Sequence, residues 1–335
     1  MASASRRSRR PRRSGGARPA AAPSSAGSGG RPPLRESALQ EAVMLHQAGE
    51  LAEAERRYRS MLRRAPEHPD LLRLLGTLCG QTRRLDQARF MLERAISHQP
   101  GNPESHYNLA NVLRDAGHLD PAIAAYRRAL EIAPGYGSAR LNLSILLLHA
   151  NPDGGRAEAL EHLEGLVRED PGHLRARHQA ALVLGGMDRW EEAAEHWRAA
   201  AQVDPVSPEH HHNLGYAYER LERLEDAKAS YEQAIRRDPK LVPSRANLGS
   251  VLRRLGDLEA ASATLEAALV IDPEHPDTLH NLASVRMDQQ RTGEALELVE
   301  RVLRIDPGHE AAKALGAQLL GIVDGERARE DAAPG

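Results

Sequence analysis

One type of side chain, a carboxamide, recurs at a fixed place along most of the chain. Its members are Asn108, Asn142, Gln179, Asn213, Asn247 and Asn281. A carboxamide offers two N–H donors and one carbonyl acceptor, which match the C=O and N–H groups of a peptide backbone. If these residues lie in one row on a folded surface, the chemistry they predict is the binding of extended polypeptide.

The spacing of the carboxamides is 34 residues, or 37 in one case, which suits successive helices of a repeat. Equivalent helices in neighbouring repeats lie about 10 Å apart, close to one helix diameter. An extended peptide advances about 3.3 Å per residue. One carboxamide would therefore meet the peptide backbone about every third residue. The alternative is that asparagine only tolerates a solvated groove or caps local backbone.

Polar and aromatic residues near the carboxamides are candidates for setting partner specificity. They are Tyr107, Asn111, Arg114, His178, His212, Tyr216, Arg220, Arg253, Arg254 and His280. No catalytic triad, phosphate-binding loop or paired carboxylate set stands out, so we expect neither an enzyme nor a cofactor. The run His210–His212 does not predict a metal site, because adjacent helical side chains point about 100° apart. The single cysteine, Cys79, is expected in the core.

Prolines mark the elements that must position these residues. Pro66, Pro100, Pro134, Pro171, Pro205, Pro239, Pro273 and Pro307 follow one another at 34 residues, with a single spacing of 37. An alanine lies twelve residues before every one of them, from Ala54 to Ala295. A small residue recurs early in each unit and a large apolar residue eight before the proline, as in Gly215 and Tyr231. This pattern predicts two packed amphipathic helices per unit, the second ended by proline.

The pattern resembles the tetratricopeptide repeat, with its 34-residue period, its Leu-Gly or Leu-Ala pair, its alanine in the second helix and its closing proline. The pairs Leu75-Gly76, Leu214-Gly215 and Leu248-Gly249 carry the resemblance. It implies an all-α, right-handed α-solenoid of about eight helix-turn-helix repeats. The expected repeats span 35–68, 69–102, 103–136, 137–173, 174–207, 208–241, 242–275 and 276–309, ending at the proline of position 307.

Two repeats depart from the family pattern. The first has Glu41 in place of the leucine. The first two repeats also break the row of carboxamides, with Gln40 and Leu74 at its position. The fourth repeat has three extra residues, which we place in a surface turn at Asn151–Gly155 because proline and glycine continue neither helix. Residues 308–323 predict a helix that caps the last repeat, and 324–335 are expected to be disordered.

In the family, the carboxamide position faces inward. The row is similar to the asparagine ladder in the repeat arm of O-linked N-acetylglucosamine transferases, which holds extended peptide backbone. Another groove of the family, a clamp for C-terminal carboxylates, requires lysine just before the asparagine. Tyr107, His212, Ala246 and His280 stand there instead, so that clamp is not expected.

Residues 1–34 differ in composition from the rest, with eight arginines, no acidic residue and few apolar side chains. We expect a disordered tail. Three interpretations are open: a solvated tail that contacts the acidic repeats, a segment that binds nucleic acid or an anionic surface, or an organelle transit peptide. The absence of a long apolar run predicts no membrane span. A cytoplasmic location is the expectation.

The sequence thus favours a scaffold or adaptor that binds an extended segment of another protein in the groove of the repeats. The first alternative is a non-catalytic subunit that recruits substrates for a separately encoded transferase. The second is nucleic-acid association through the basic tail. The sequence names no particular partner.

Overall fold

The computed structural model describes residues 36–331, which form helices and turns and contain no strand. Each repeat contributes a first or A helix and a second or B helix. The A helices are α1 (Glu36–Gln47), α3 (Pro69–Gln81), α5 (Pro103–Asp115), α7 (Gly137–Ala150), α9 (Leu174–Gly185), α11 (Pro208–Arg220), α13 (Val242–Arg254) and α15 (Pro276–Asp288). The B helices are α2 (Leu51–Leu62), α4 (Leu85–His98), α6 (Leu119–Ile132), α8 (Arg156–Glu169), α10 (Trp190–Val203), α12 (Leu224–Arg237), α14 (Leu258–Ile271) and α16 (Thr292–Ile305). A last helix, α17, spans Glu310–Asp331.

The chain divides into two compact units between Pro66 and Glu67. The first unit holds the α1–α2 pair, in which Ala42, Ala54 and Tyr58 are fully buried. The hydroxyl of Tyr58 donates a hydrogen bond to the Ala42 carbonyl at 3.3 Å. The second unit holds α3 to α17 and carries all the carboxamides of the predicted row.

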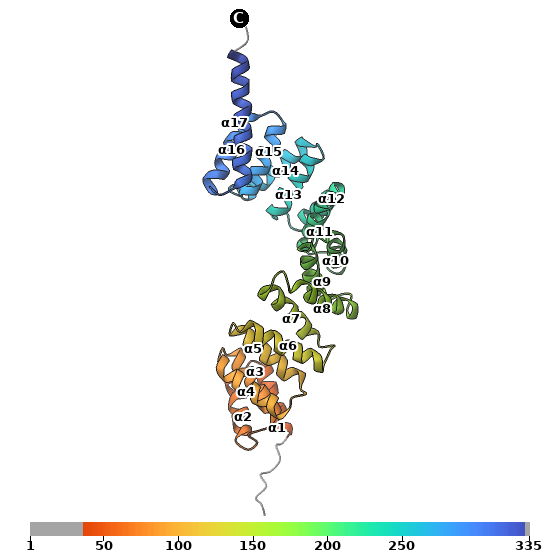
Figure 1. Cartoon of the computed structure of the whole chain (residues 1–335), viewed down its shortest axis with the longest axis vertical. Helices are drawn as coiled ribbons and strands as arrows, with labels where there is room; N and C mark the ends of the chain where they lie inside the picture. The colour runs from red at the N-terminus through yellow and green to blue at the C-terminus, as the bar shows by residue number, and fades with distance from the viewer. Residues whose placement is uncertain (1–35, 332–335) are drawn as a thin grey trace, which may run out of the picture. The chain divides into compact units, whose positions relative to one another are not determined.

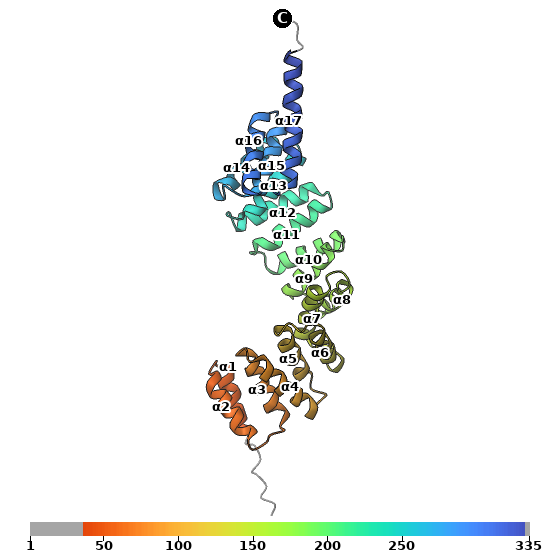
Figure 2. The ribbon, with the colours of Figure 1, turned by 60° about the vertical axis from the view of Figure 1, so that its left-hand side comes forward.

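Within the second unit, each helix packs against its neighbours in the sequence, and the pairs follow one another in chain order (Figures 1 and 2). Successive A helices also pack on each other at α3–α5, α11–α13 and α13–α15, and α15 packs on α17. No two of the described B helices pack to a comparable extent. At these places the A helices therefore lie closer together than the B helices of the same repeats.

Small residues in the A helices let the paired helices approach. A Cβ atom added to Gly215 would lie 2.8 Å from the ring of Tyr231, and one added to Gly76 would lie 2.7 Å from Leu92. Real Cβ contacts are not that short, so a side chain at either position would force its neighbour to shift. The alanine of each B helix is fully buried in every repeat. The small and large residues of the sequence pattern are thus two sides of one packing contact.

Aspartate and proline shape the connections between repeats. In Asp170, Asp238, Asp272 and Asp306 the carboxylate accepts the backbone N–H two residues later, at 2.9 to 3.2 Å. This closes a tight turn just after each B helix. Proline then occupies the first turn of several A helices, where its missing N–H costs nothing.

The turns between A and B helices pass through the left-handed region of backbone space. Gly117 and Gly256 have φ of 81° and 84°, but Asp188 and Glu222 adopt φ of 56° and 57° at equivalent places. The fourth repeat departs from this pattern, since five residues join α7 to α8 there. They are the Asn151–Gly155 segment in which the sequence places its extra residues.

Helix α17 extends further than the sequence indicated. The expected end was residue 323, with disorder beyond it, but the helix continues to Asp331. The added segment contains the helix-favouring residues Glu, Arg and Ala and no proline. Ala312, Leu315 and Leu319 bury one side of α17 against the last repeat. The arginine-rich tail of residues 1–34 lies outside the described residues, and none of the described helices is long and apolar enough to span a membrane.

Candidate functional site

The six predicted carboxamides lie in register on the A helices of six successive repeats, α5 to α15. All six are half-buried, so each keeps part of its side chain open to solvent. None is sealed between helices. Neighbouring positions on the same helices, such as Ala110 and Ala283, are fully buried instead. The A-helix face therefore presents one carboxamide per repeat.

Two of these carboxamides use their N–H groups to tie adjacent repeats together. Asn108 Nδ2 donates to Thr77 Oγ1 of the preceding repeat at 3.0 Å. Asn142 Nδ2 lies 3.2 Å from Tyr107 Oη and 3.3 Å from Asn111 Oδ1, both on α5. Asn111 Oδ1 also accepts the Tyr126 hydroxyl at 2.6 Å. Two predicted specificity residues, Tyr107 and Asn111, thus support the row itself.

Two further carboxamides make the same kind of link. Asn247 Nδ2 donates to Tyr231 Oη at 3.2 Å, and Tyr231 Oη donates onward to Glu219 Oε2 at 3.0 Å. Asn281 Nδ2 donates to the Ala246 carbonyl at 3.1 Å. These acceptors fix which end of each amide is nitrogen. A hydroxyl that already donates elsewhere must accept from the amide.

The carbonyl oxygens of the six carboxamides are left without donors. Among the described contacts, no N–H or O–H of the chain reaches any of these oxygens. Within residues 36–331, the amides of Gln179 and Asn213, on α9 and α11, have no hydrogen-bond partner at either end. The row therefore presents acceptors along its whole length, and both donors and acceptors at its centre.

The four predicted arginines are engaged with acidic residues of this chain. Arg114 binds Asp115 at 2.8 Å, and Arg253 binds Asp288 at 2.9 Å. Arg220 lies 3.6 Å from Asp188. Arg254 pairs with Glu222 and lies 3.6 Å from Glu219. Most of these pairs join successive repeats, so they leave little free positive charge on the face.

Tyr216 is the most open of the predicted aromatic residues, at 42% exposure. Its ring meets Trp190 edge-on, with centroids 5.5 Å apart, and the guanidinium carbon of Arg220 lies 4.5 Å from the Trp190 centroid. Leu182, at the equivalent position of α9, is 51% exposed. Sequence reasoning missed Leu182, although it follows Gln179 by three residues, as Tyr216 follows Asn213. The centre of the face is thus apolar as well as amide-rich.

The predicted histidines are partly enclosed. Burial lowers the pKa of His178, His212 and His280 from its ordinary value, which favours their neutral forms. His212 Nδ1 lies 2.8 Å from Ser244 Oγ, and the ring of His280 lies 5.2 Å from that of His309. His178 meets the ring of Trp197 edge-on at 4.7 Å. These rings pack between repeats more than they project from them.

A cavity of about 380 Å³ opens between α9 and α11, beside Gln179. It is lined by Leu174, Arg175, His178, Gln179, Asp204, Ser207, Glu209 and His210. Sequence reasoning found His178 and Gln179 but did not assign Asp204, Ser207 or Glu209 to a site. One signal was available: His210 stands three residues before the carboxamide, where five other repeats have a small residue.

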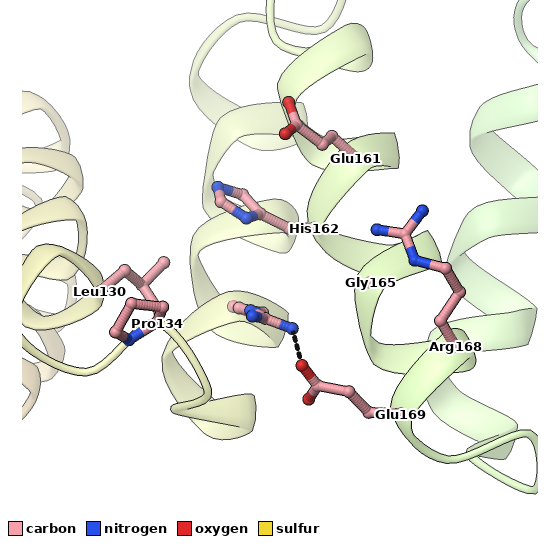
Figure 3. A pocket seen from close by; sticks show the side chains of 8 residues that line it. Leu130, Pro134, Glu161, His162, Gly165, Arg168 and Glu169 are labelled. Carbon is pink, nitrogen blue, oxygen red and sulfur yellow. Dashed lines mark hydrogen bonds and ion pairs between the residues drawn. The ribbon is translucent and has the colours of Figure 1, made fainter.

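A second cavity of about 380 Å³ lies between the end of α6, α7 and α8 (Figure 3). Its charged lining is balanced, with Arg140 and Arg168 facing Glu161 and Glu169. Arg140 binds Glu169 at 2.6 Å, the contact drawn in Figure 3. His162 and Gly165 complete the wall, and burial lowers the pKa of His162. Nothing in this lining selects one sign of charge.

The remaining candidates for chemistry lie within the packing. Cys79 is buried in α3, 1% exposed. His210, His211 and His212 point to different surroundings, since His210 is buried and the other two are half-buried. Within residues 36–331, no group of three or more histidine, cysteine or acidic residues is placed to hold a metal ion.

Comparison with known proteins gives the family. Models of the tetratricopeptide repeat match residues 45–112 and 252–319, residues 103–136, and residues 178–242. Together they cover more than half of the chain. Cellulose synthase operon protein C of Pseudomonas fluorescens (strain SBW25) is 27% identical over 154 residues, 44% of this chain. The chain spans 12% of the length of that relative.

Solved structures share the architecture. The C-terminal part of a TPR repeat-containing protein from Cytophaga hutchinsonii matches 72% of this chain and 97% of its own, with a TM-score of 0.59 and 13% identity. YrrB, described as a TPR protein with an unusual peptide-binding site, matches 67% of this chain and 96% of its own, with a TM-score of 0.39 and 20% identity. The latter likeness is too low to compare binding residues. The period, the helix pairs and the family-model matches agree: the chain belongs to the tetratricopeptide repeat family.

Proposed function

We propose that this chain is a non-catalytic scaffold that holds an extended segment of another protein along its carboxamide row. Tetratricopeptide repeats are typically scaffolds for protein–protein interaction. The observation that carries the proposal is the set of six carbonyl oxygens, in register on the A helices and without donors among the described residues. An extended peptide has backbone N–H groups that fit such acceptors.

The proposal differs in one respect from a simple amide ladder. Asn108, Asn142, Asn247 and Asn281 each commit N–H groups to a neighbouring repeat. These bonds hold the amide planes before any ligand arrives, so less side-chain freedom is lost on binding. Gln179 and Asn213 keep both ends available and mark the centre of the bound segment. Exposed Leu182 and Tyr216 would contact its side chains there.

A selection experiment tests this function. Random peptides of about 18 residues, long enough to span the row at about three residues per carboxamide, are displayed and selected on the full chain. The dissociation constant of a selected peptide is then measured by fluorescence anisotropy. The variant carries Asn213→Ala, Asn247→Ala and Asn281→Ala. At about 1 kcal/mol for each hydrogen bond, its affinity should fall about a hundredfold.

A matched variant separates the row from a general loss of amides. Gln99→Ala, Gln202→Ala and Gln318→Ala remove three exposed carboxamides elsewhere on the described chain. This variant should bind as the unmodified chain does. Equal binding by both variants would discard the row as the binding element. Circular dichroism melts must accompany the measurements, because Asn247 and Asn281 each lose one internal hydrogen bond.

No observation favours the alternatives over this function. Recruitment of substrate to a separately encoded transferase would use the same face, and co-purification with a catalytic chain is its test. Nucleic-acid association rests on residues 1–34, which lie outside the described residues. It predicts salt-sensitive binding that is lost when the tail is removed.

A further inference from the structure

We propose that the cavity between α9 and α11 receives a basic side chain, lysine or arginine, of the bound segment. This deepens the proposed function and rests on it. The cavity opens beside Gln179, at the centre of the carboxamide row. A residue of a peptide lying along the row would therefore have the cavity within reach of its side chain.

Asp204 departs from the role of its equivalents in other repeats. Asp170, Asp238, Asp272 and Asp306 each accept the backbone N–H two residues later. Among the described contacts, Asp204 accepts no such bond. Its carboxylate instead lines the cavity, with His210 Nε2 3.9 Å from Oδ2. The carboxylate that closes the turn elsewhere is thus available to a ligand here.

His210 supplies a second, independent feature of the cavity. It is only 7% exposed, and its Nδ1 atom is buried without a hydrogen-bond partner. The equivalent positions hold Ser105, Ala139, Ala176, Ser244 and Thr278, which are small and buried. A proton on Nε2, the nitrogen that faces Asp204, leaves Nδ1 as an acceptor. No other described repeat places an imidazole at the position of His210.

The other polar groups of the lining favour a cation over an anion. Glu209 adds a second carboxylate, with His178 Nε2 3.8 Å from its oxygen. Ser207 and Gln179 add neutral acceptors. Neither Asp204 nor Glu209 forms an ion pair with lysine or arginine within the described residues. This contrasts with exposed acids such as Glu192, which Arg189 binds at 2.6 Å.

Arg175 is part of the cavity lining, and its removal tests whether the ligand is a cation or an anion. It is exposed and forms no ion pair with either carboxylate in the described structure. Its positive charge should weaken the binding of a cation and strengthen that of an anion. Removing it therefore moves the affinity in opposite directions for the two kinds of ligand.

The experiment uses the same displayed library and the full chain. Peptides selected on the unmodified chain should share one lysine or arginine at a fixed position. Replacing that residue with its neutral analogue, citrulline for arginine or norleucine for lysine, should weaken binding about ten- to a hundredfold. Asp204→Asn with Glu209→Gln should weaken the parent peptide equally. The two losses should not add when combined, because they remove one contact.

Two single substitutions keep the test independent of folding. Glu209 is largely exposed, so Glu209→Gln alone should leave the melting temperature unchanged and still weaken the basic peptide. Arg175→Ala should strengthen it severalfold. Glu300→Gln, an exposed acid on α16, is the matched control and should have no effect.

The outcomes separate this proposal from the function on which it rests. Selected peptides that need the carboxamides but show no basic position, or additive losses in the combined variant, overturn the cavity assignment alone. Weaker binding of the basic peptide by Arg175→Ala also overturns it. A selection that yields no binding peptide overturns the scaffold function and this inference together.

Discussion

Asn247 and Tyr231 are joined across the boundary of two repeats, with the amide nitrogen 3.2 Å from the phenol oxygen. The phenol hydroxyl itself donates a hydrogen bond to Glu219 Oε2 at 3.0 Å. Tyr231 is fully buried, and burial raises its pKa, so it remains a donor at neutral pH. One hydroxyl therefore orients a carboxamide of the row and supports a half-buried carboxylate.

The variant Tyr231→Phe tests this link. It removes the acceptor of Asn247 and the donor of Glu219 without changing the packing. The free energy of unfolding, measured by urea denaturation, should fall by about 1 to 2 kcal/mol. Tyr216→Phe is the control, because that exposed hydroxyl only meets Arg220 at 3.5 Å. Equal stability of the two variants would show that the Tyr231 hydroxyl contributes nothing.

The close approach of α11 and α12 predicts a strong effect at Gly215. In Gly215→Ala, the new methyl group would lie 2.8 Å from the Tyr231 ring, so the helices must separate. We expect a loss of about 2 to 3 kcal/mol in unfolding free energy. Gly321→Ala meets nothing within 4 Å and should instead stabilise α17 by about 0.5 to 1 kcal/mol. Thermal melts of both variants provide the measurement, and shifts of the same sign would contradict the packing described.

Arg286 carries a buried charge where five other repeats have leucine. Its guanidinium pairs with Glu266 and lies 3.0 Å from Glu294, with the side chain 8% exposed. Both acids are about half exposed and can be hydrated if the arginine is removed. Arg286→Leu should therefore leave stability unchanged or raise it by up to about 2 kcal/mol.

A shorter side chain at the same place separates volume from charge. Arg286→Ala should cost about 2 kcal/mol or more, because it leaves a cavity. Calorimetric melts compare the two variants. If leucine destabilises as much as alanine does, the charge itself is required for stability.

Buried histidines make the stability depend on pH. Burial lowers the pKa of His162, His178, His196, His211, His212 and His280 from the ordinary 6.5. The unfolded chain then binds more protons than the folded one below pH 6.5. The neutral histidines therefore make their whole contribution to the free energy of unfolding above this pH. The free energy of unfolding should fall as the pH drops through it.

Urea denaturation between about pH 7.5 and about pH 5.5 measures this slope, in a range where most carboxylates remain charged. His212→Gln should reduce the slope by the contribution of one buried ring. A stability that is constant or rises toward acid over this range would contradict the prediction.

Much of the architecture follows from the sequence because it rests on local rules. The proline spacing and the small and large residues predict helix pairs, and the structure has them from α1 to α16. The register of the carboxamides follows from the same repeat. The end of α17 at Asp331 did not follow, because a short charged segment with helix propensity has the same composition as a disordered tail.

The side-chain partners were less accessible to sequence reasoning. Whether Asn108 donates to Thr77, or Arg254 pairs with Glu222, depends on how two neighbouring repeats approach. The spacing of residues along one helix does not give the distance between side chains of two neighbouring repeats. Asp204 is the clearest case, since its motif is the same as that of Asp238. Only the residues that pack around it in the folded chain show that its carboxylate lines a cavity.

The unfilled carbonyl oxygens of the carboxamide row have a consequence for the kind of chain that can lie on it. In the proposed binding mode, a proline or an N-methylated residue opposite Gln179 or Asn213 would place a carbon atom where the carbonyl oxygen requires an N–H donor. A polyproline segment lacks these N–H groups throughout, so we expect the row to bind it more weakly than an ordinary extended segment.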